Sequence, residues 1–186
     1  MLRNKPSPRP SPAPAGAGEG ISLKKFFKFK NMVNKDFSKN LIKGKIAEII
    51  FQQMWAEVGK YTILPLGYEK VFPGLIDKYY SKALKPIRSA PDFVLIPKDK
   101  NDDNIMIVEI KFRRRAEEYN RIKEVAKEQN KRWKPSYIFV ATLKAFYFDK
   151  CDEILKNNTM SKLSTDIIPQ KVQDKYAALL NSFIYK

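Results

Sequence analysis

Two short apolar runs, at residues 93–96 and 105–110, constrain the fold of this chain more than any other feature. A polar loop at residues 98–104, rich in Lys, Asp and Asn, separates them. Runs of this length on either side of such a loop are typical of two strands in a hairpin or a tight meander. The second run is apolar at both alternating sets of positions, so we expect a strand that is buried on both faces.

Charged residues stand at the ends of both predicted strands. Asp92 directly precedes the first run, and Glu109 and Lys111 close the second. Alternate residues of a strand share a face, so Glu109 and Lys111 point the same way. A buried strand that turns ionic on one face at its end indicates a functional site.

The remaining apolar patterns predict helices and strands around this pair. The expected helices and strands are, in chain order, helix 36–58, strand 61–66, helix 114–134, strand 137–142, strand 145–148 and helix 169–184. Residues 75–84 are compatible with a short helix. The resulting order of helix, three strands, helix and strand predicts an α/β fold with a central mixed sheet flanked by helices.

The two long helices before and after the charged strands each carry a polar residue in an apolar setting. The predicted apolar stripe of the first consists of Ile42, Ile46, Ile49, Ile50, Met54 and Val58. Glu48 falls on a mostly apolar part of that helix, and Gly59 is its expected end. The stripe of the second consists of Tyr119, Ile122, Ala126 and Trp133, and Gln129 lies within it.

The beginning of the chain differs in composition from the rest. Residues 1–20 are mainly Pro, Ala, Ser and Gly, which favours a disordered segment. Residues 21–30 interleave phenylalanine with lysine, a pattern that suits either base stacking or a short element docked on the core. We therefore expect a disordered, Pro-rich and basic tail at residues 1–30 and one domain at residues 31–186.

The composition excludes several chemistries. The chain has no histidine, which excludes Ser-His-Asp hydrolases and His-ligated zinc or iron sites. Its one cysteine, Cys151, excludes an internal disulfide and fits a reducing compartment. No apolar run approaches the length of a membrane span. We expect a cytoplasmic protein, associated with the nucleoid if it is prokaryotic, and no membrane partner.

The excess of positive charge predicts a polyanionic partner. The chain carries 36 Lys and Arg against 20 Asp and Glu, a net charge of +16. Residues 1–30 hold seven bases and one acid, so the remainder still has 29 bases against 19 acids. A domain that is basic by itself favours nucleic acid as its ligand.

The spacing of the charged residues matches a known signature. Pro91-Asp92, sixteen intervening residues and Glu109-Ile110-Lys111 resemble the motif of the PD-(D/E)xK nuclease superfamily, which has the restriction-endonuclease-like fold. The expected order αβββαβ is similar to that superfamily's core, and Glu48 stands where many members carry an acid on the preceding helix. The resemblance covers roughly residues 36–148 and includes small stand-alone members such as Holliday-junction resolvases.

This resemblance implies an endonuclease that uses Mg²⁺ or Mn²⁺. Asp92, Glu109 and the backbone carbonyl of Ile110 would hold the cation, and Glu48 would hold a second one or a metal-bound water. Lys111 would position the attacking water or lower its pKa, and it would stabilise the negative charge that develops on the phosphate. Gln129 looks like the polar residue that members often place on the following helix.

Basic residues cluster in sequence next to every proposed site acid. They are Lys43, Lys45, Arg88, Arg113, Arg114 and Arg115. Such residues at the ends of elements usually only increase solubility, but here we expect them to bind DNA phosphates. A homodimer is compatible with this reading, since it would allow symmetric cutting of two strands.

Two alternative functions stay open. The first is a non-catalytic nucleic-acid-binding protein on the same fold, which would bind DNA in a salt-dependent manner without cutting it. The second is an interaction protein that docks through residues 21–30 or through the last helix, and it would not bind polyanions.

Overall fold

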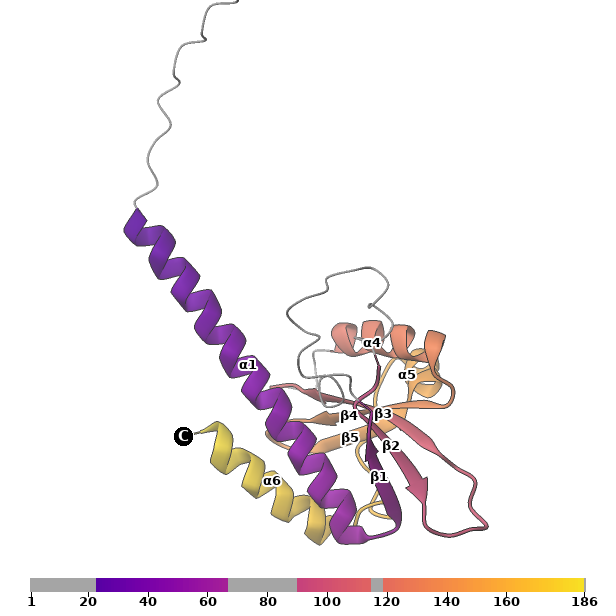
Figure 1. Ribbon diagram of the computed structural model, residues 1–186. Helices are drawn as coiled ribbons and strands as arrows, with labels where there is room; N and C mark the ends of the chain where they lie inside the picture. The colour runs from indigo at the N-terminus through magenta and orange to yellow at the C-terminus, as the bar shows by residue number, and fades with distance from the viewer. Residues whose placement is uncertain (1–22, 67–89, 115–118, 186) are drawn as a thin grey trace, which may run out of the picture. The chain divides into compact units, whose positions relative to one another are not determined.

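The computed structural model describes residues 23–66, 90–114 and 119–185. By its internal contacts the chain divides into two compact units, Met1–Ser38 and Lys39–Lys186, and the sheet belongs to the second. Most of the expected tail, the expected short helix at residues 75–84, and the site residues Arg88 and Arg115 lie outside the described residues. Helices and strands carry the labels of Figure 1.

Helix α1 spans Leu23–Val58 and begins earlier than the residue 36 expected from sequence. It ends at Gly59, whose φ of 73° lies in the left-handed region and whose N–H donates to the carbonyl of Trp55 at 3.1 Å. Glycine adopts this conformation without the steric penalty of a Cβ, so Gly59 stops the helix as expected.

The sheet has five strands in the order β1-β2-β3-β4-β5. Their bounds are β1 Tyr61–Pro65, β2 Phe93–Pro97, β3 Met106–Phe112, β4 Ser136–Ala141 and β5 Phe146–Lys150. Three neighbouring pairs are antiparallel, and β3 and β4 are parallel. A parallel pair needs a crossover connection, which helix α4, Tyr119–Arg132, provides. The sheet is mixed, and the order α1-β1-β2-β3-α4-β4 is the expected αβββαβ.

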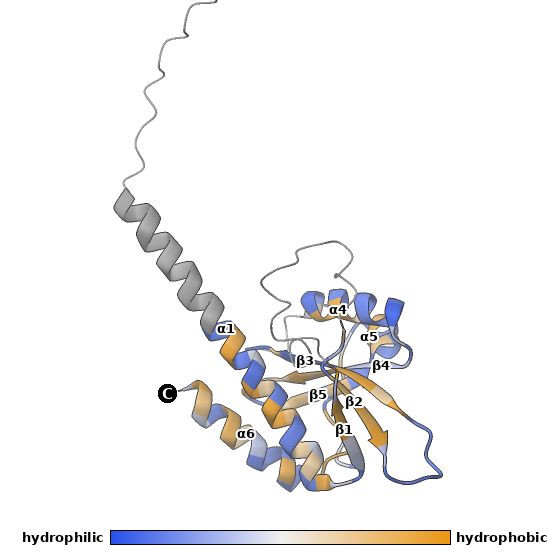
Figure 2. Ribbon diagram, viewed as in Figure 1, coloured by the Kyte–Doolittle hydropathy of each residue, from blue (hydrophilic) through white to orange (hydrophobic). Residues whose placement is uncertain are grey.

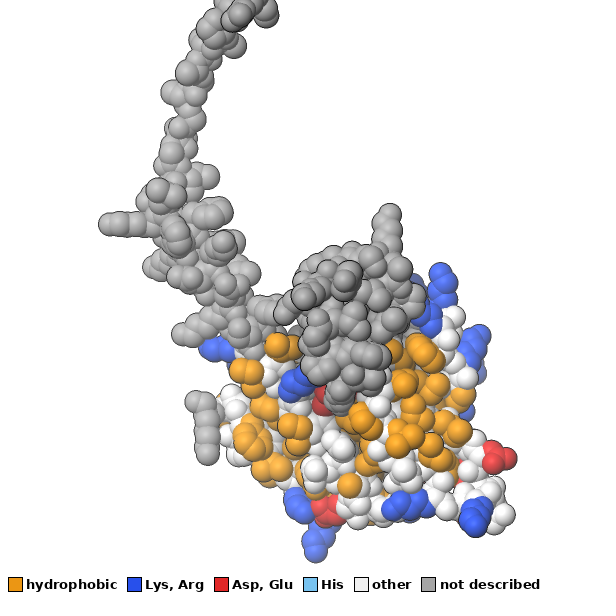
Figure 3. Space-filling view, in the orientation of Figure 1, with side chains coloured by type: hydrophobic (Ala, Val, Ile, Leu, Met, Phe, Trp, Pro, Cys, Tyr) orange, Lys and Arg blue, Asp and Glu red, His pale blue; other side chains and the backbone are white. Residues whose placement is uncertain are grey.

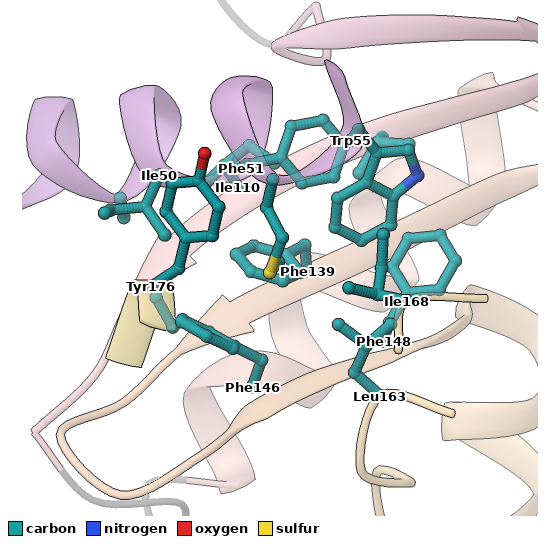
Figure 4. Close-up of a cluster of buried hydrophobic side chains, with 14 of the residues drawn as sticks. Ile50, Phe51, Trp55, Ile110, Phe139, Phe146, Phe148, Leu163, Ile168 and Tyr176 are labelled. Atoms are coloured by element: carbon teal, nitrogen blue, oxygen red, sulfur yellow. The ribbon is translucent and has the colours of Figure 1, made fainter. Parts of the chain in front are cut away.

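One face of the sheet packs against α1 and α6, which spans Gln170–Ile184. The side chains of Phe51 and Trp55 from α1 meet Phe139 of β4, with ring centroids 5.1 and 5.5 Å from that of Phe139 (Figure 4). The two helices lie side by side (Figure 1), and the Tyr176 hydroxyl of α6 donates to Glu57 of α1 at 3.0 Å. This face therefore forms the larger of the two hydrophobic cores.

The opposite face carries α4 and a short helix, α5, Cys151–Asn157. Its smaller core is formed by Ile122, Ala126, Ile138, Val140, Cys151 and Ile154. Figure 2 shows the hydrophilic outer side of α4 and the apolar strands beneath the helices. None of the described helices is long and apolar enough to cross a membrane.

The structure corrects the predicted buried face of α1. The buried residues are Ala47, Ile50, Phe51, Met54 and Trp55, whereas Ile42 and Ile49 are 59% and 57% exposed. The expected stripe was wrong at Ile42 and Ile49 because the two aromatic side chains dominate the packing and turn those isoleucines outward. Helix α5 was not expected, and the strand bounds agree to within two residues.

Candidate active site

Asp92 is fixed by hydrogen bonds to both neighbouring strands. Its backbone N–H donates to the Val108 carbonyl of β3, and its own carbonyl accepts from the N–H of Leu66, each at 3.0 Å. Its side-chain Oδ2 accepts the N–H of Ile110 at 2.7 Å. Asp92 stands one residue before β2 begins, so its carboxylate satisfies a backbone N–H of β3 at a point where β2 supplies no strand partner.

Glu109 and Lys111 lie on one face of β3, as their spacing predicts. Met106, Val108 and Ile110 belong to the large core on the other face. Lys111 forms an ion pair with Glu109 through Oε1, and the Glu109 side chain is only 12% exposed. The expected alternation is therefore confirmed, and it brings an acid and a base together at the end of a buried strand.

Gln129 reaches the same place from helix α4. Its Nε2 donates to Oε2 of Glu109 at 3.3 Å, and the residue is buried. The two oxygens of Glu109 thus have different partners, Lys111 on one and Gln129 on the other. Gln129 holds the orientation of this carboxylate across the gap between α4 and β3.

Glu48 approaches the site from helix α1. Its side chain is 13% exposed and accepts hydrogen bonds from Lys45 at 3.1 and 3.4 Å. Burial is the largest cause of the raised pKa of Asp92 and of Glu109, and the charge of Glu48 adds a smaller contribution to both. Sequence reasoning assigned Lys45 to DNA binding and missed its pairing with Glu48. The signal was present, since residues three apart are neighbours on a helix.

Burial and mutual repulsion perturb the site carboxyls. Burial and, to a smaller extent, the charge of Glu109 raise the pKa of Asp92, Lys111 and the Ile110 N–H oppose the rise, and the net pKa is about 7. Burial also raises the pKa of Glu109, against the opposing effect of Lys111. Burial and the nearby like charges together therefore outweigh the attraction of Lys111 for the ionised carboxyls, so both pKa values rise. Perturbed carboxyls of this kind are typical of functional sites.

The chemistry of the donor set fits a hard divalent cation. Within the described ranges, no group of three or more Asp, Glu or Cys side chains is arranged to hold a metal ion. Mg²⁺ in proteins usually has one or two carboxylate ligands, with water and substrate phosphate completing the shell. Asp92 and Glu109 suffice for this, and a cation would offset the burial and the like charges that raise their pKa values.

The described basic residues lie around these acids with different partners. The Lys43 ammonium lies 6.0 Å from the ring centroid of Phe112, the last residue of β3. Arg113 donates its backbone N–H to Ala141 at 3.0 Å and a guanidinium N–H to the Phe112 carbonyl at 2.8 Å. Arg114 is exposed. Lys43, Arg113 and Arg114 therefore lie at or next to the end of β3 that carries Lys111.

Fold and site together define an α/β protein with a buried carboxylate–lysine cluster at the open end of two antiparallel strands of a mixed sheet. No protein-family model matches the chain, and no curated protein matches it. Among solved structures, a Holliday junction resolvase from the archaeal hyperthermophile Archaeoglobus fulgidus is similar, with 12% identity and a TM-score of 0.32. The match covers 71% of this chain and 98% of that one.

Proposed function

We propose that the protein is a metal-dependent endonuclease that hydrolyses DNA phosphodiester bonds. The observation that carries the proposal is the convergence of Asp92, Glu109 and Lys111, with Glu48 and Gln129 beside them, in one partly buried cluster. A net charge of +16 supports a polyanionic substrate. The absence of histidine leaves carboxylates as the ligands for a cation.

In this proposal Asp92 and Glu109 hold Mg²⁺ or Mn²⁺, with the Ile110 carbonyl as a further ligand and Glu48 acting on a second ion or a bound water. The cation would supply Lewis-acid stabilisation of the scissile phosphate. Lys111 positions the attacking water and stabilises the charge that develops on the phosphate. The water oxygen forms a bond to phosphorus as the bond to the leaving oxygen breaks, and a proton passes to that oxygen.

The remaining residues support this chemistry. Gln129 keeps Glu109 in one orientation, because its Nε2 donates to Oε2. Positive charge for binding the DNA backbone would come from four described residues beside the site, Lys43, Lys45, Arg113 and Arg114. Arg88 and Arg115, which lie outside the described residues, are expected from the sequence to do the same. Lys45 would contribute once a cation has replaced it as the partner of Glu48.

One observation favours the alternative, a DNA-binding protein on the same fold that does not cut. Two of the site acids are already paired with lysines: Glu109 with Lys111, and Glu48 with Lys45. A chain that uses these pairs only to stabilise its fold would bind DNA through its remaining bases. Such a protein would show salt-dependent binding and no product.

The decisive experiment incubates the full chain with duplex, single-stranded and branched DNA in Mg²⁺, Mn²⁺ or EDTA. We expect cleavage with either metal, none in EDTA, and a loss of at least about a hundredfold in Asp92→Asn and Lys111→Ala. Lys175→Ala is the matched control, because it also removes a lysine ion pair, the one that joins Lys175 of α6 to Glu57 of α1. Cleavage that persists in Asp92→Asn, or binding without cleavage on every substrate, contradicts the proposal.

A further inference from the structure

An apolar surface that no described helix covers lies on the same face of the sheet as the candidate active site. The face of β1, β2 and β3 that points away from the large core is lined by Leu64, Val94, Ile96, Ile105 and Ile107, which we call the apolar shelf. Leu64 pairs with Val94, and Val94 pairs with Ile107, so these three form one row across the three strands. Figure 3 shows hydrophobic side chains gathered over this part of the sheet.

The apolar shelf belongs to neither hydrophobic core. The described helices on this side of the sheet, α4 and α5, pack against β4 and β5. Leu64 and Ile105 are each 45% exposed, and Val94, Ile96 and Ile107 are partly exposed. No charged residue interrupts the shelf between Leu64 and Ile107. Exposed apolar patches next to polar sites are typical of surfaces that bind a ligand or a partner.

The apolar shelf adjoins the site carboxylates directly. Ile107 and Glu109 are successive residues on one face of β3, and Val94 stands in the same relation to Asp92. Two residues of a strand span about 7 Å, and three neighbouring strands span about 10 Å. A phosphate at the carboxylates therefore has its own nucleoside within reach of the row formed by Leu64, Val94 and Ile107.

The chemistry of the apolar shelf selects among nucleic-acid structures. In a duplex the faces of the bases are stacked, and only their edges are open in the grooves. An aliphatic surface can meet the face of a base only where that base is unstacked, as in single strands, loops and extruded nucleotides. A second copy of the chain seated on the shelf would cover the carboxylates beside it, so the substrate itself is the better occupant.

We propose that the apolar shelf receives the face of an unpaired nucleobase beside the scissile phosphate. The protein then acts on DNA whose target strand is unpaired at the cut. This inference rests on the proposed nuclease function, and it names the substrate class of the same site.

The test measures binding, so that it is separate from cleavage. Single-stranded DNA with one fluorescent 2-aminopurine is titrated with the full chain in Ca²⁺, alongside a duplex of the same sequence. We expect the single strand to bind with a change in 2-aminopurine fluorescence. Leu64→Ser should weaken this binding about fivefold and reduce the fluorescence change. Ile105→Ser, just outside β3, should weaken it less, and it replaces Leu64→Ser if the β1 variant does not fold.

The matched control is Leu179→Ser on α6, which also removes an exposed leucine, 41% exposed against 45% for Leu64. This control should bind within twofold of the unchanged chain, and the duplex should bind all variants alike. Shelf variants that equal the control, or that weaken duplex binding equally, overturn the proposal. A dimer in sedimentation that Leu64→Ser alone dissociates also overturns it, because the shelf then holds a second copy. Absence of cleavage on every substrate contradicts the nuclease function. The binding results above still show whether the apolar shelf binds an unpaired base.

Discussion

Replacing Asp92 with asparagine should stabilise the fold at alkaline pH while it removes the proposed activity. The pKa of Asp92 is raised from about 3.8 to about 7 by burial and by Glu109. Between these pH values the folded chain keeps a proton that the unfolded chain has released, so stability falls as pH rises through this window. Three pKa units correspond to on the order of 4 kcal/mol, a penalty that is fully present above pH 7.

Asparagine has no such penalty and keeps the hydrogen bond, because its side-chain oxygen can accept the Ile110 N–H as Oδ2 of Asp92 does at 2.7 Å. We expect equal melting temperatures for Asp92→Asn and the unchanged chain near pH 4. At pH 8 the variant should melt roughly 5–15 °C higher. Thermal unfolding followed by circular dichroism from pH 4 to pH 9, without divalent cations, measures this difference.

Asp92→Ala separates charge from hydrogen bonding. It also removes the charge but leaves the Ile110 N–H without its acceptor, so it should be about 1–3 kcal/mol less stable than Asp92→Asn at every pH. A difference between Asp92→Asn and the unchanged chain that does not vary with pH refutes the assignment of the raised pKa. If Asp92→Asn is less stable than the unchanged chain at pH 8, ionised Asp92 does not destabilise the fold.

Three further outcomes are expected. Mg²⁺ at a hundred times its dissociation constant should stabilise the unchanged chain by about 2.7 kcal/mol and leave Asp92→Asn unaffected. Equal gains in melting temperature for the two proteins would contradict a metal site at Asp92. Gln129→Ala should weaken the apparent metal affinity about tenfold or more, because Gln129 no longer orients Glu109, with little change in the cleavage rate at saturating metal. A metal titration of cleavage measures both quantities, and an unchanged affinity would show that Gln129 does not support Glu109 as a ligand. Trp55→Ala should destabilise the fold by about 3–5 kcal/mol in urea unfolding, since Trp55 is completely buried. Trp55→Phe should be far milder, because Trp55 Nε1 is buried without a hydrogen-bond partner among the described residues; equal losses would contradict this reasoning.

The strands at the site could be predicted from sequence because their pattern is local. Alternation over residues 105–111 determines which side chains share a face, and the structure shows Glu109 and Lys111 on one side and Val108 and Ile110 on the other. The hairpin was equally clear from the polar loop between two apolar runs. The central mixed sheet flanked by helices, with its αβββαβ order, followed from the order of these patterns.

Features that depend on packing between distant segments could not be predicted. Ile42 and Ile49 fit a helical apolar stripe as well as Phe51 does, and only the position of Phe139 on β4 decides which face is buried. The apolar shelf could not be predicted from sequence for the same reason: the pattern of β3 predicts a strand buried on both faces, yet the described helices on that side pack mainly against β4 and β5. The metal ligation and the roles of the site residues stay predictions.

The larger core explains how the chain tolerates a site that opposes folding. Asp92 and Glu109 both have raised pKa values, so their ionisation destabilises the folded state at neutral pH. Glu109 lies on β3, and on the other face of β3 the side chains of Met106, Val108 and Ile110 are buried in the large core with α1 and α6. Burial of each such side chain contributes about 1.5–3 kcal/mol, so the three together offset a penalty on the order of 4 kcal/mol.

The alternation of β3 thus places stabilising apolar side chains and the proposed site on opposite faces of one strand. A substitution on its core face, such as Val108→Ala, removes part of the stabilisation that holds the charged face in place. Divalent cation would restore some of it, because neutralising Asp92 and Glu109 removes the opposing term. If the site binds a divalent cation as proposed, metal binding and folding would be linked, because the cation would bind the folded chain in preference to the unfolded chain.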